Sequence, residues 1–284
     1  MTWMTPGTVG EAVELKAAYP DATVVAGGTF VGVLTRQGLH DAEDWISLQN
    51  VPELREISTG ADLALGAMVT HRTIERSQEI TVGWPGVQRV FSVVASPRVR
   101  NVATIGGVLG DADHAADPPA MLVALDAWVE ALSVRGLRRV AVADLVTGYY
   151  ETSLAEDELI TRVLVPSGRH HITYRKLRTR SQEDRPCVAV AAALHEGQVS
   201  VVVGAVAGRP QYFPDLCATW IPGDDAGTRE IAGGYADRID PISDSRGSAA
   251  YRTRMISVEV RRALEELAPA ARGQGMTMTR RSGA

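Results

Sequence analysis

The chain has 284 residues, 45% of them hydrophobic, which is enough for about two domains with cores of ordinary size. Its formal net charge is only −5 at pH 7 and no basic patch or stripe stands out, so nucleic-acid binding is not expected. Cys187 and Cys217 are the only cysteines, too few for an iron–sulfur cluster or a disulfide framework, and they favour a reduced, cytoplasmic protein.

The pattern of the first part of the chain predicts two small units, each with helices and strands. Residues 1–6 lack the basic and apolar regions of a signal peptide. Thr8 and Glu11 have the spacing of a capping box, which predicts the start of the first helix. Pro52 indicates a boundary, so we expect one subdomain over residues 1–55 and a second over 56–170. The expected elements are a helix over 8–19, strands over 23–25, 46–48, 54–58 and 63–67, helices from 70 and around 87–94, a short helix running into a strand over 119–131, and strands over 137–142 and 159–165.

A third unit is expected over residues 171–268. The apolar run 188–206 is long enough to suggest a membrane span, but the sequence His-Glu-Gly-Gln at 195–198 interrupts it with charge, so we predict two buried strands around a turn and no membrane span. Residues 269–284 have little to bury and are expected to be a disordered tail. The expected elements are strands over 172–177, 188–194 and 199–206, and helices from 228 and over 249–267.

Adjacent glycines occur at Gly27-Gly28 and again at Gly106-Gly107. Without Cβ atoms, such a backbone can approach a ligand closely and present a row of amide donors, which is what a diphosphate needs. Thr29 follows the first doublet directly, and its hydroxyl could help to hold the same ligand from another side. Two loops of this kind predict a dinucleotide bound in an extended conformation, although each doublet alone would suit an ordinary tight turn.

The order of short motifs along nearly the whole chain resembles the FAD-binding medium subunit of molybdenum hydroxylases, of the carbon monoxide dehydrogenase and xanthine dehydrogenase type. The motifs are Ala26-Gly27-Gly28-Thr29, Ser96-Pro97-Arg98-Val99-Arg100-Asn101, Thr104-Ile105-Gly106-Gly107, Ala115-Ala116-Asp117, Gly148-Tyr149, Tyr174-Arg175-Lys176, Asp240-Pro241-Ile242 and Tyr251-Arg252. The resemblance implies an α+β protein with a PCMH-type, vanillyl-alcohol oxidase-like FAD-binding fold of two subdomains. It also implies a C-terminal α+β domain with a three-stranded antiparallel sheet.

The resemblance also implies which residues bind FAD. In the family the acid at Asp117 contacts the flavin, although an aspartate before Pro118-Pro119 is also a good helix N-cap. The lysine at Lys176 lies near the pyrimidine end of the flavin, whereas by default it is a solvated charge on a strand edge. Ile160 packs on the flavin or belongs simply to the core. The expected cofactor-binding residues are Val25, Ala26, Gly27, Gly28, Thr29, Phe30, Thr104, Ile105, Gly106, Gly107, Val108, Asp113, Asp117, Ile160 and Lys176.

Four positions depart from the family pattern and put the polar contacts of the FAD loops in question. His114 replaces a proline, Val108 an asparagine, Phe30 a small polar or acidic residue, and Pro118 a leucine. The imidazole of His114 could stabilise negative charge or move protons, but a loop histidine facing solvent is the simpler interpretation.

No catalytic motif is present, and the catalytic residues stay unknown, with His114 and Tyr149 as the candidates. Tyr149 and Tyr150 are expected to pack at a seam between subdomains, and contact of one of them with the flavin is the alternative. No metal site is expected, because His170-His171 has no carboxylate or cysteine at ligand spacing.

The function that this resemblance implies is an FAD-binding oxidoreductase subunit that passes electrons between an iron–sulfur and molybdenum partner and an external acceptor. The partner subunits, one carrying iron–sulfur clusters and one the molybdenum cofactor, have to supply the ligands that this chain lacks. One alternative is a stand-alone FAD-dependent enzyme that acts directly on a small organic molecule, suggested by the altered residues Phe30, Val108 and His114. A further alternative is a flavin-free scaffold or binding protein.

Overall fold

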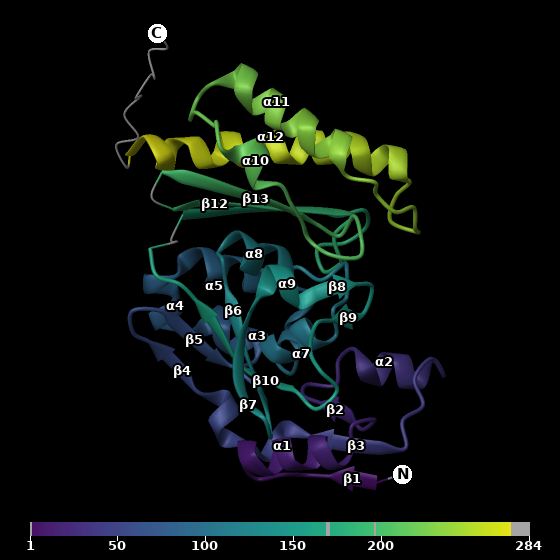
Figure 1. Ribbon diagram of the computed structural model, residues 1–284. Helices are drawn as coiled ribbons and strands as arrows, with labels where there is room; N and C mark the ends of the chain where they lie inside the picture. Colours follow the sequence, from purple (N-terminus) through teal and green to yellow (C-terminus); the bar gives the residue numbers. More distant parts are fainter. Residues whose placement is uncertain (1, 169–170, 196, 274–284) are drawn as a thin grey trace.

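The computed structural model describes residues 2–168, 171–195 and 197–273. Its three larger sheets follow one another along the chain, with the N-terminal sheet at one end of the molecule and the C-terminal sheet with its long helices at the other (Figure 1). This mixture of sheets and helices agrees with the predicted α+β class. The boundaries at residues 55 and 170 stay predictions.

The N-terminal unit is a small parallel sheet with strand order β1-β3-β2, covered by one helix. Thr8 caps that helix as predicted, since its hydroxyl accepts a hydrogen bond from the amide of Glu11. Ala12 and Val13 are buried in the hydrophobic core that this unit shares with the rest of the N-terminal half, so the helix is held by its apolar face. The elements are β1 Thr2–Met4, α1 Val9–Ala18, β2 Thr23–Val25, α2 Val31–Arg36, β3 Asp44–Ser47, and the 3₁₀ turns Leu48–Asn50 and Pro52–Arg55.

The middle unit is built on a five-stranded antiparallel sheet with the order β4-β5-β10-β6-β7. The pairing of β10 with β6 shifts between Ile160 and Arg162, a bulge that changes the direction of the side chains at that point. The elements are β4 Ile57–Thr59, β5 Leu63–Gly66, α3 His71–Arg76, α4 Gln78–Gly83, α5 Pro85–Ser92, α6 Pro97–Arg100, α7 Ile105–Gly110, α8 Pro118–Ala124, β6 Trp128–Ser133, β7 Gly136–Ala141, α9 Val142–Leu145, β8 Val146–Gly148, β9 Glu151–Thr152 and β10 Leu159–Val165.

The C-terminal unit is an antiparallel sheet under helices. Three long strands form it as predicted, and the two-residue strand β14 adds a fourth at its edge, which the sequence analysis did not predict. The apolar run 188–206 is confirmed as two buried strands, and no helix among the described residues is long and apolar enough to cross a membrane. The elements are β11 His171–Leu177, β12 Val188–His195, β13 Gln198–Gly204, β14 Gln211–Tyr212, α10 Pro214–Cys217, α11 Asp225–Arg238 and α12 Ala249–Gly273.

Helix α8 joins the middle and C-terminal units, and each of its residues is buried. Alternate residues of β12 face opposite sides: Val190 and Ala192 join the core under α11 and α12, while Ala191 and Ala193 join the core that includes α8. Gly204 of β13 leaves room for α8, because a Cβ atom there would lie 3.0 Å from that of Ala120. The sheet is therefore covered on both faces at β12, which explains why that central strand is almost continuously apolar.

The structure corrects part of the predicted tail. Helix α12 continues to Gly273, so residues 269–273 are helical, and Ala271 is buried in the C-terminal core. Residues 274–284 lie outside the described residues.

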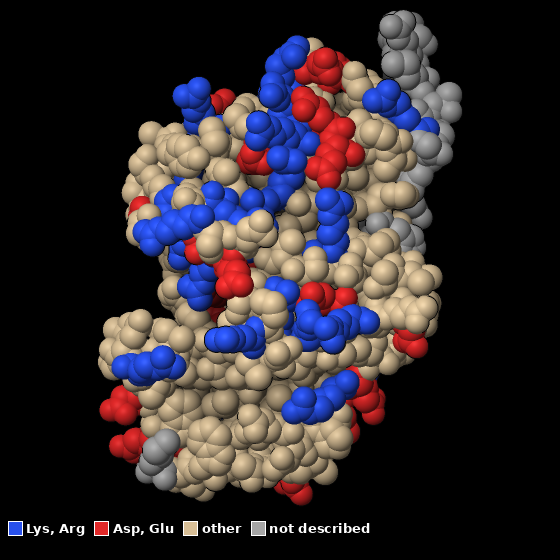
Figure 2. Space-filling view, turned by 180° about the vertical axis from the view of Figure 1, so that it is seen from behind, with Lys and Arg blue, Asp and Glu red and all other residues tan. Residues whose placement is uncertain are grey.

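On the reverse face of the molecule, Lys and Arg side chains gather across the middle and upper part, with Asp and Glu side chains among them (Figure 2).

Candidate functional site

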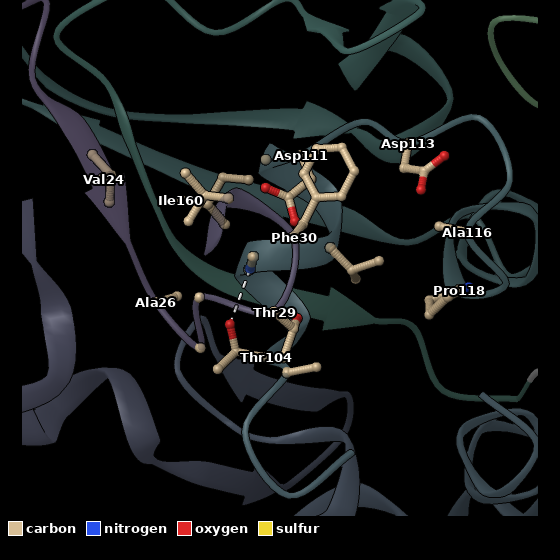
Figure 3. A pocket seen from close by; sticks show the side chains of 18 of the residues that line it. Val24, Ala26, Thr29, Phe30, Thr104, Asp111, Asp113, Ala116, Pro118 and Ile160 are labelled. Carbon is tan, nitrogen blue, oxygen red and sulfur yellow. Dashed lines mark hydrogen bonds between the residues drawn. The ribbon is translucent and has the colours of Figure 1, made fainter. Parts of the chain in front are cut away.

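A cavity of about 720 Å³ lies where segments of all three units meet, and Figure 3 shows it from close by. Its volume is within the roughly 300–1,000 Å³ of small-molecule and cofactor sites. Val25 and Ile105, both buried, do not line it. The predicted cofactor-binding residues that do line it are Ala26, Gly27, Gly28, Thr29, Phe30, Thr104, Gly106, Gly107, Val108, Asp113, Asp117, Ile160 and Lys176.

The loop after β2 presents unpaired main-chain donors to this cavity. No described residue accepts a hydrogen bond from the amides of residues 27–30. Gly27 has to be glycine, because a Cβ atom there would lie only 1.9 Å from the carbonyl oxygen of Val102. Gly28 has φ +67°, a conformation that favours glycine. Close packing and one left-handed residue thus produce a run of four amides without protein acceptors, which is an anion-binding arrangement.

The second glycine loop is built differently from the sequence expectation. Thr104 caps α7, since its hydroxyl accepts from the amide of Gly107 at 3.1 Å (dashed in Figure 3). The amides of Ile105 and Gly106 donate to the carbonyl oxygens of Val69 and Ala67 at 3.0 and 2.9 Å. The expected row of free donors in this loop is therefore wrong for these three amides, because the segment after β5 accepts from two of them and the Thr104 hydroxyl accepts from the third.

The two glycines of this second loop have different roles. A Cβ atom on Gly106 would lie 2.6 Å from the Cβ atom of Ala67, so Gly106 permits close packing of α7 on that segment. A Cβ atom on Gly107 would meet the hydroxyl of Thr104 at 2.9 Å but otherwise has space toward the cavity. Gly107 therefore leaves room for a ligand to lie against the backbone, whereas Gly106 is needed for the close packing of α7.

A buried ion pair forms another part of the wall. Lys176 Nζ donates to Asp117 Oδ2 at 2.9 Å and to the carbonyl oxygen of Val93 at 3.1 Å. The hydroxyl of Tyr174 donates to Asp117 Oδ1 at 2.7 Å. Asp117 stands at the N-cap position of α8, but its side chain makes no capping hydrogen bond. The carboxylate therefore holds β11 against α8 instead of capping the helix.

The side chains of Lys176 and Asp117 are only 2% and 4% exposed, so Lys176 is not a solvated charge on a strand edge. Burial raises the pKa of Asp117 and lowers the pKa of Lys176, and the attraction between the two charges opposes both shifts. Burial and the neighbouring Asp117 raise the pKa of Tyr174, so this hydroxyl stays a donor. The result is a paired cation and anion at the cavity wall whose charges largely offset each other.

An aromatic pair forms a third part of the wall. The rings of Phe30 and Tyr150 stack with centroids 5.6 Å apart and an interplanar angle of 20°. The guanidinium carbon of Arg185 lies 5.8 Å from the centre of the Phe30 ring, and Arg185 Nη2 lies 2.8 Å from Asp113 Oδ2. Tyr150 and not Tyr149 is thus the tyrosine that lines the cavity.

His114 and Tyr149, the candidates for a catalytic role, lie outside the cavity lining. The His114 side chain is 12% exposed and packs edge-on against Tyr149 at 5.2 Å between ring centroids, so the interpretation that it faces solvent is wrong. Neither of its ring nitrogens has a hydrogen-bond partner among the described residues, although Nδ1 lies 3.6 Å from Asp113 Oδ1. Burial lowers the pKa of His114, which favours its neutral form.

Sequence reasoning missed several residues that line the cavity, chiefly His71, Asp111 and Arg185. His71 Nε2 lies 3.2 Å from the carbonyl oxygen of Thr104, and burial lowers the pKa of His71 to about 4. The sequence around His71, just after the helix-starting Thr70, does not indicate its contact with Thr104, because the two residues are more than thirty positions apart. Asp111 and Arg185 line the cavity because the fold brings their two segments together, and no local sequence pattern indicates this.

Comparisons with known proteins give one consistent result. Residues 1–168 match the family model described as FAD binding domain in molybdopterin dehydrogenase, and residues 172–267 match the CO dehydrogenase flavoprotein C-terminal domain. The nicotine 6-hydroxylase medium subunit of Paenarthrobacter nicotinovorans is 33% identical over 93% of this chain and 96% of its own. The carbon monoxide dehydrogenase medium chain of Afipia carboxidovorans is 30% identical over 92% of this chain and 94% of its own. A chain of quinoline 2-oxidoreductase from Pseudomonas putida 86 has a TM-score of 0.89 at 28% identity, covering 95% of this chain and 98% of that one.

The fold and the cavity, together with these matches over nearly the whole chain, define an FAD-binding oxidoreductase subunit. The chain belongs to the family of FAD-binding medium subunits of molybdenum hydroxylases, the type found in carbon monoxide dehydrogenase and xanthine dehydrogenase. The predicted family, fold class, FAD cofactor and subunit function are therefore confirmed. The stand-alone flavoenzyme and the flavin-free scaffold are not favoured.

Proposed function

We propose that this chain holds FAD with the diphosphate at the amides of residues 27–30 and the flavin toward Lys176 and Asp117, and that it relays electrons between a metal-containing partner and an external acceptor. The observation that carries the proposal is the run of four amides without protein acceptors on the same cavity as that buried ion pair. An anionic diphosphate satisfies these donors, so the residues present fit FAD.

Five further predicted residues have assigned places in this proposal. Gly107 and Val108 form the surface on which the cofactor lies, and Ile160 adds apolar contact from β10. Val25 and Ile105 support the two loops from behind, and neither contacts the cofactor directly in this assignment.

Bound FAD supplies the capacity to take up and release one or two electrons. With FAD bound, Lys176 would supply positive charge that favours negative charge on the flavin, and Asp117 would limit that effect. The stacked rings of Phe30 and Tyr150, held by Arg185, limit the access of water at their part of the wall.

The partners in this proposal are an iron–sulfur subunit and a molybdenum-cofactor subunit, and the organic substrate reacts at the molybdenum partner. The support is that this chain has only two cysteines, both buried, while its relatives are named as medium subunits. We also propose a cytoplasmic location, supported by these two cysteines, which are free of any disulfide.

The test is purification of the affinity-tagged chain from its native cells. Iron and molybdenum should co-elute with the flavin in fixed ratio. The isolated FAD-loaded chain, mixed anaerobically with the organic substrate that the assembled complex oxidises, should keep its flavin oxidised. Rapid flavin reduction by that substrate in the absence of the partners would instead establish a stand-alone enzyme.

A further inference from the structure

Asp111 is an acid that faces the proposed cofactor cavity. It follows α7 directly and occupies the C-cap position of that helix. Its carboxyl group lines the cavity, and Figure 3 shows the side chain among those that point inward.

This carboxyl group has no partner within the part of the chain that the structure describes: no hydrogen bond or ion pair reaches it. Arg185, which lines the same cavity, is committed elsewhere, because its Nη2 pairs with Asp113 Oδ2 at 2.8 Å. Asp113 Oδ1 in turn accepts from the amide of Ala115 at 3.0 Å. Asp113 is therefore a partnered carboxylate, whereas the Asp111 carboxyl group has no protein partner among the described residues of the same cavity.

The charges around Asp111 favour its neutral form. Burial and the negative charge of Asp113 raise the pKa of Asp111 to about 7, and Arg185 only partly opposes this. The proposed diphosphate at residues 27–30 would add negative charge to the same cavity, so an ionised Asp111 would repel it. The other ionisable side chains that line the cavity are Lys16, His40, His71, Asp117, Tyr150, Glu156, Glu158, Lys176, Glu183 and Asp184.

We propose that Asp111 binds the cofactor as a neutral carboxylic acid that donates a hydrogen bond to an anionic oxygen of FAD, so that FAD is retained when Asp111 is protonated and released when it ionises. The inference rests on the proposed FAD site. Binding then takes up one proton on Asp111 when the free protein starts ionised, and no other bond changes.

Proton linkage sets the size of the effect. If only the protonated form binds, the apparent Kd is the intrinsic Kd divided by the protonated fraction. With a pKa of about 7, the Kd for FAD should rise about 30-fold between pH 6 and pH 8.5. The phosphates of FAD are fully ionised throughout this range and contribute no such change.

The experiment is a fluorescence titration of the deflavinated full-length chain with FAD at pH 6, 7 and 8.5. The wild type should bind FAD about 30-fold more weakly at pH 8.5 than at pH 6. Asp111→Asn, which stays a neutral donor, should bind FAD with the same Kd at each pH. Asp184→Asn removes an exposed acid from the same cavity and should keep the wild-type pH dependence. A pH-independent wild type, or an Asp111→Asn variant with unchanged pH dependence, would overturn the inference.

A second measurement needs no variant. Calorimetric titration of the wild type at pH 8 in buffers of different ionisation enthalpy should show uptake of about one proton per FAD. No proton uptake would also overturn the inference while leaving the FAD site intact. Failure of the wild type to bind FAD at any pH would refute the proposed site itself, and the inference with it.

Discussion

The buried pair of Lys176 and Asp117 predicts shifts of opposite sign in the flavin midpoint potential. Reduction adds negative charge to the flavin, which a neighbouring ammonium stabilises and a neighbouring carboxylate destabilises. Lys176→Met should therefore lower the midpoint, and Asp117→Asn should raise it. Because the two charged groups are only 2.9 Å apart, each largely masks the other in the wild type.

The magnitudes follow from this spacing. With an effective dielectric constant of about 20, an ammonium about 6 Å from the ring contributes roughly 2.8 kcal/mol, and a carboxylate 2.9 Å farther away cancels roughly two thirds of this. Asp117→Asn should thus raise the midpoint by about 40 mV, since 30 mV corresponds to about 1.4 kcal/mol in a two-electron couple. Lys176→Met should lower it by about 20 mV if Asp117 then becomes protonated, and by about 60 mV if Asp117 stays ionised.

The assay is an anaerobic potentiometric titration of the flavin absorbance with FAD occupancy measured for each variant. Lys16→Met is the matched control, because Lys16 is the other lysine of the chain and lines the same cavity from α1. Its midpoint should stay within about 10 mV of the wild type, well below the roughly 40 mV expected for Asp117→Asn. Unchanged midpoints in both Lys176→Met and Asp117→Asn at full occupancy would refute the proposed position of the flavin.

Three further predictions concern the loops and acid stability. Gly28→Ala and Gly38→Ala both force alanine into positive φ and should each cost roughly 1–2 kcal/mol in urea unfolding, but only Gly28→Ala should weaken FAD binding, at least tenfold, since Gly38 lies outside the cavity. Equal FAD affinities would contradict this. Gly106→Ala should destabilise the fold by about 1–3 kcal/mol through contact with Ala67, and an unchanged unfolding midpoint would count against the packing described. Because burial lowers the pKa of His71 to about 4, the unfolded chain binds one more proton than the folded protein between about pH 6.5 and 4. The free energy of unfolding should therefore fall by up to about 3 kcal/mol as the pH decreases over that range. His71→Phe should lose less stability, and an acid-unfolding profile identical to that of the wild type would disprove the assignment.

The larger elements of the fold could be predicted from the sequence because local patterns specify them. The apolar run 188–206 broken at 195–198 gave the hairpin of β12 and β13, and the capping box at Thr8 gave α1. The short strands β1 and β14 were missed, because two or three residues carry too little periodicity and owe their conformation to pairing with β3 and β13.

The site could be predicted only where it follows a family motif. The glycines and Lys176 that the family motifs single out line the cavity, but the hydrogen bonds of α7 did not follow from its sequence. Its amides find acceptors at Ala67 and Val69, more than thirty positions earlier in the chain, and no local pattern shows this. Asp111 was missed for the same reason: its lack of a partner within the described fold is a tertiary feature that no local pattern shows.

A crystal structure of the FAD-loaded chain tests the proposed FAD site most directly. The diphosphate oxygens should lie within about 3 Å of the amide nitrogens of residues 27–30, the distance of an N–H···O hydrogen bond. The pyrimidine end of the flavin should lie beside Lys176. A diphosphate bound instead to amides of Ile105, Gly106 and Gly107 freed from their present acceptors, with the loop at 27–30 unoccupied, would contradict the central claim.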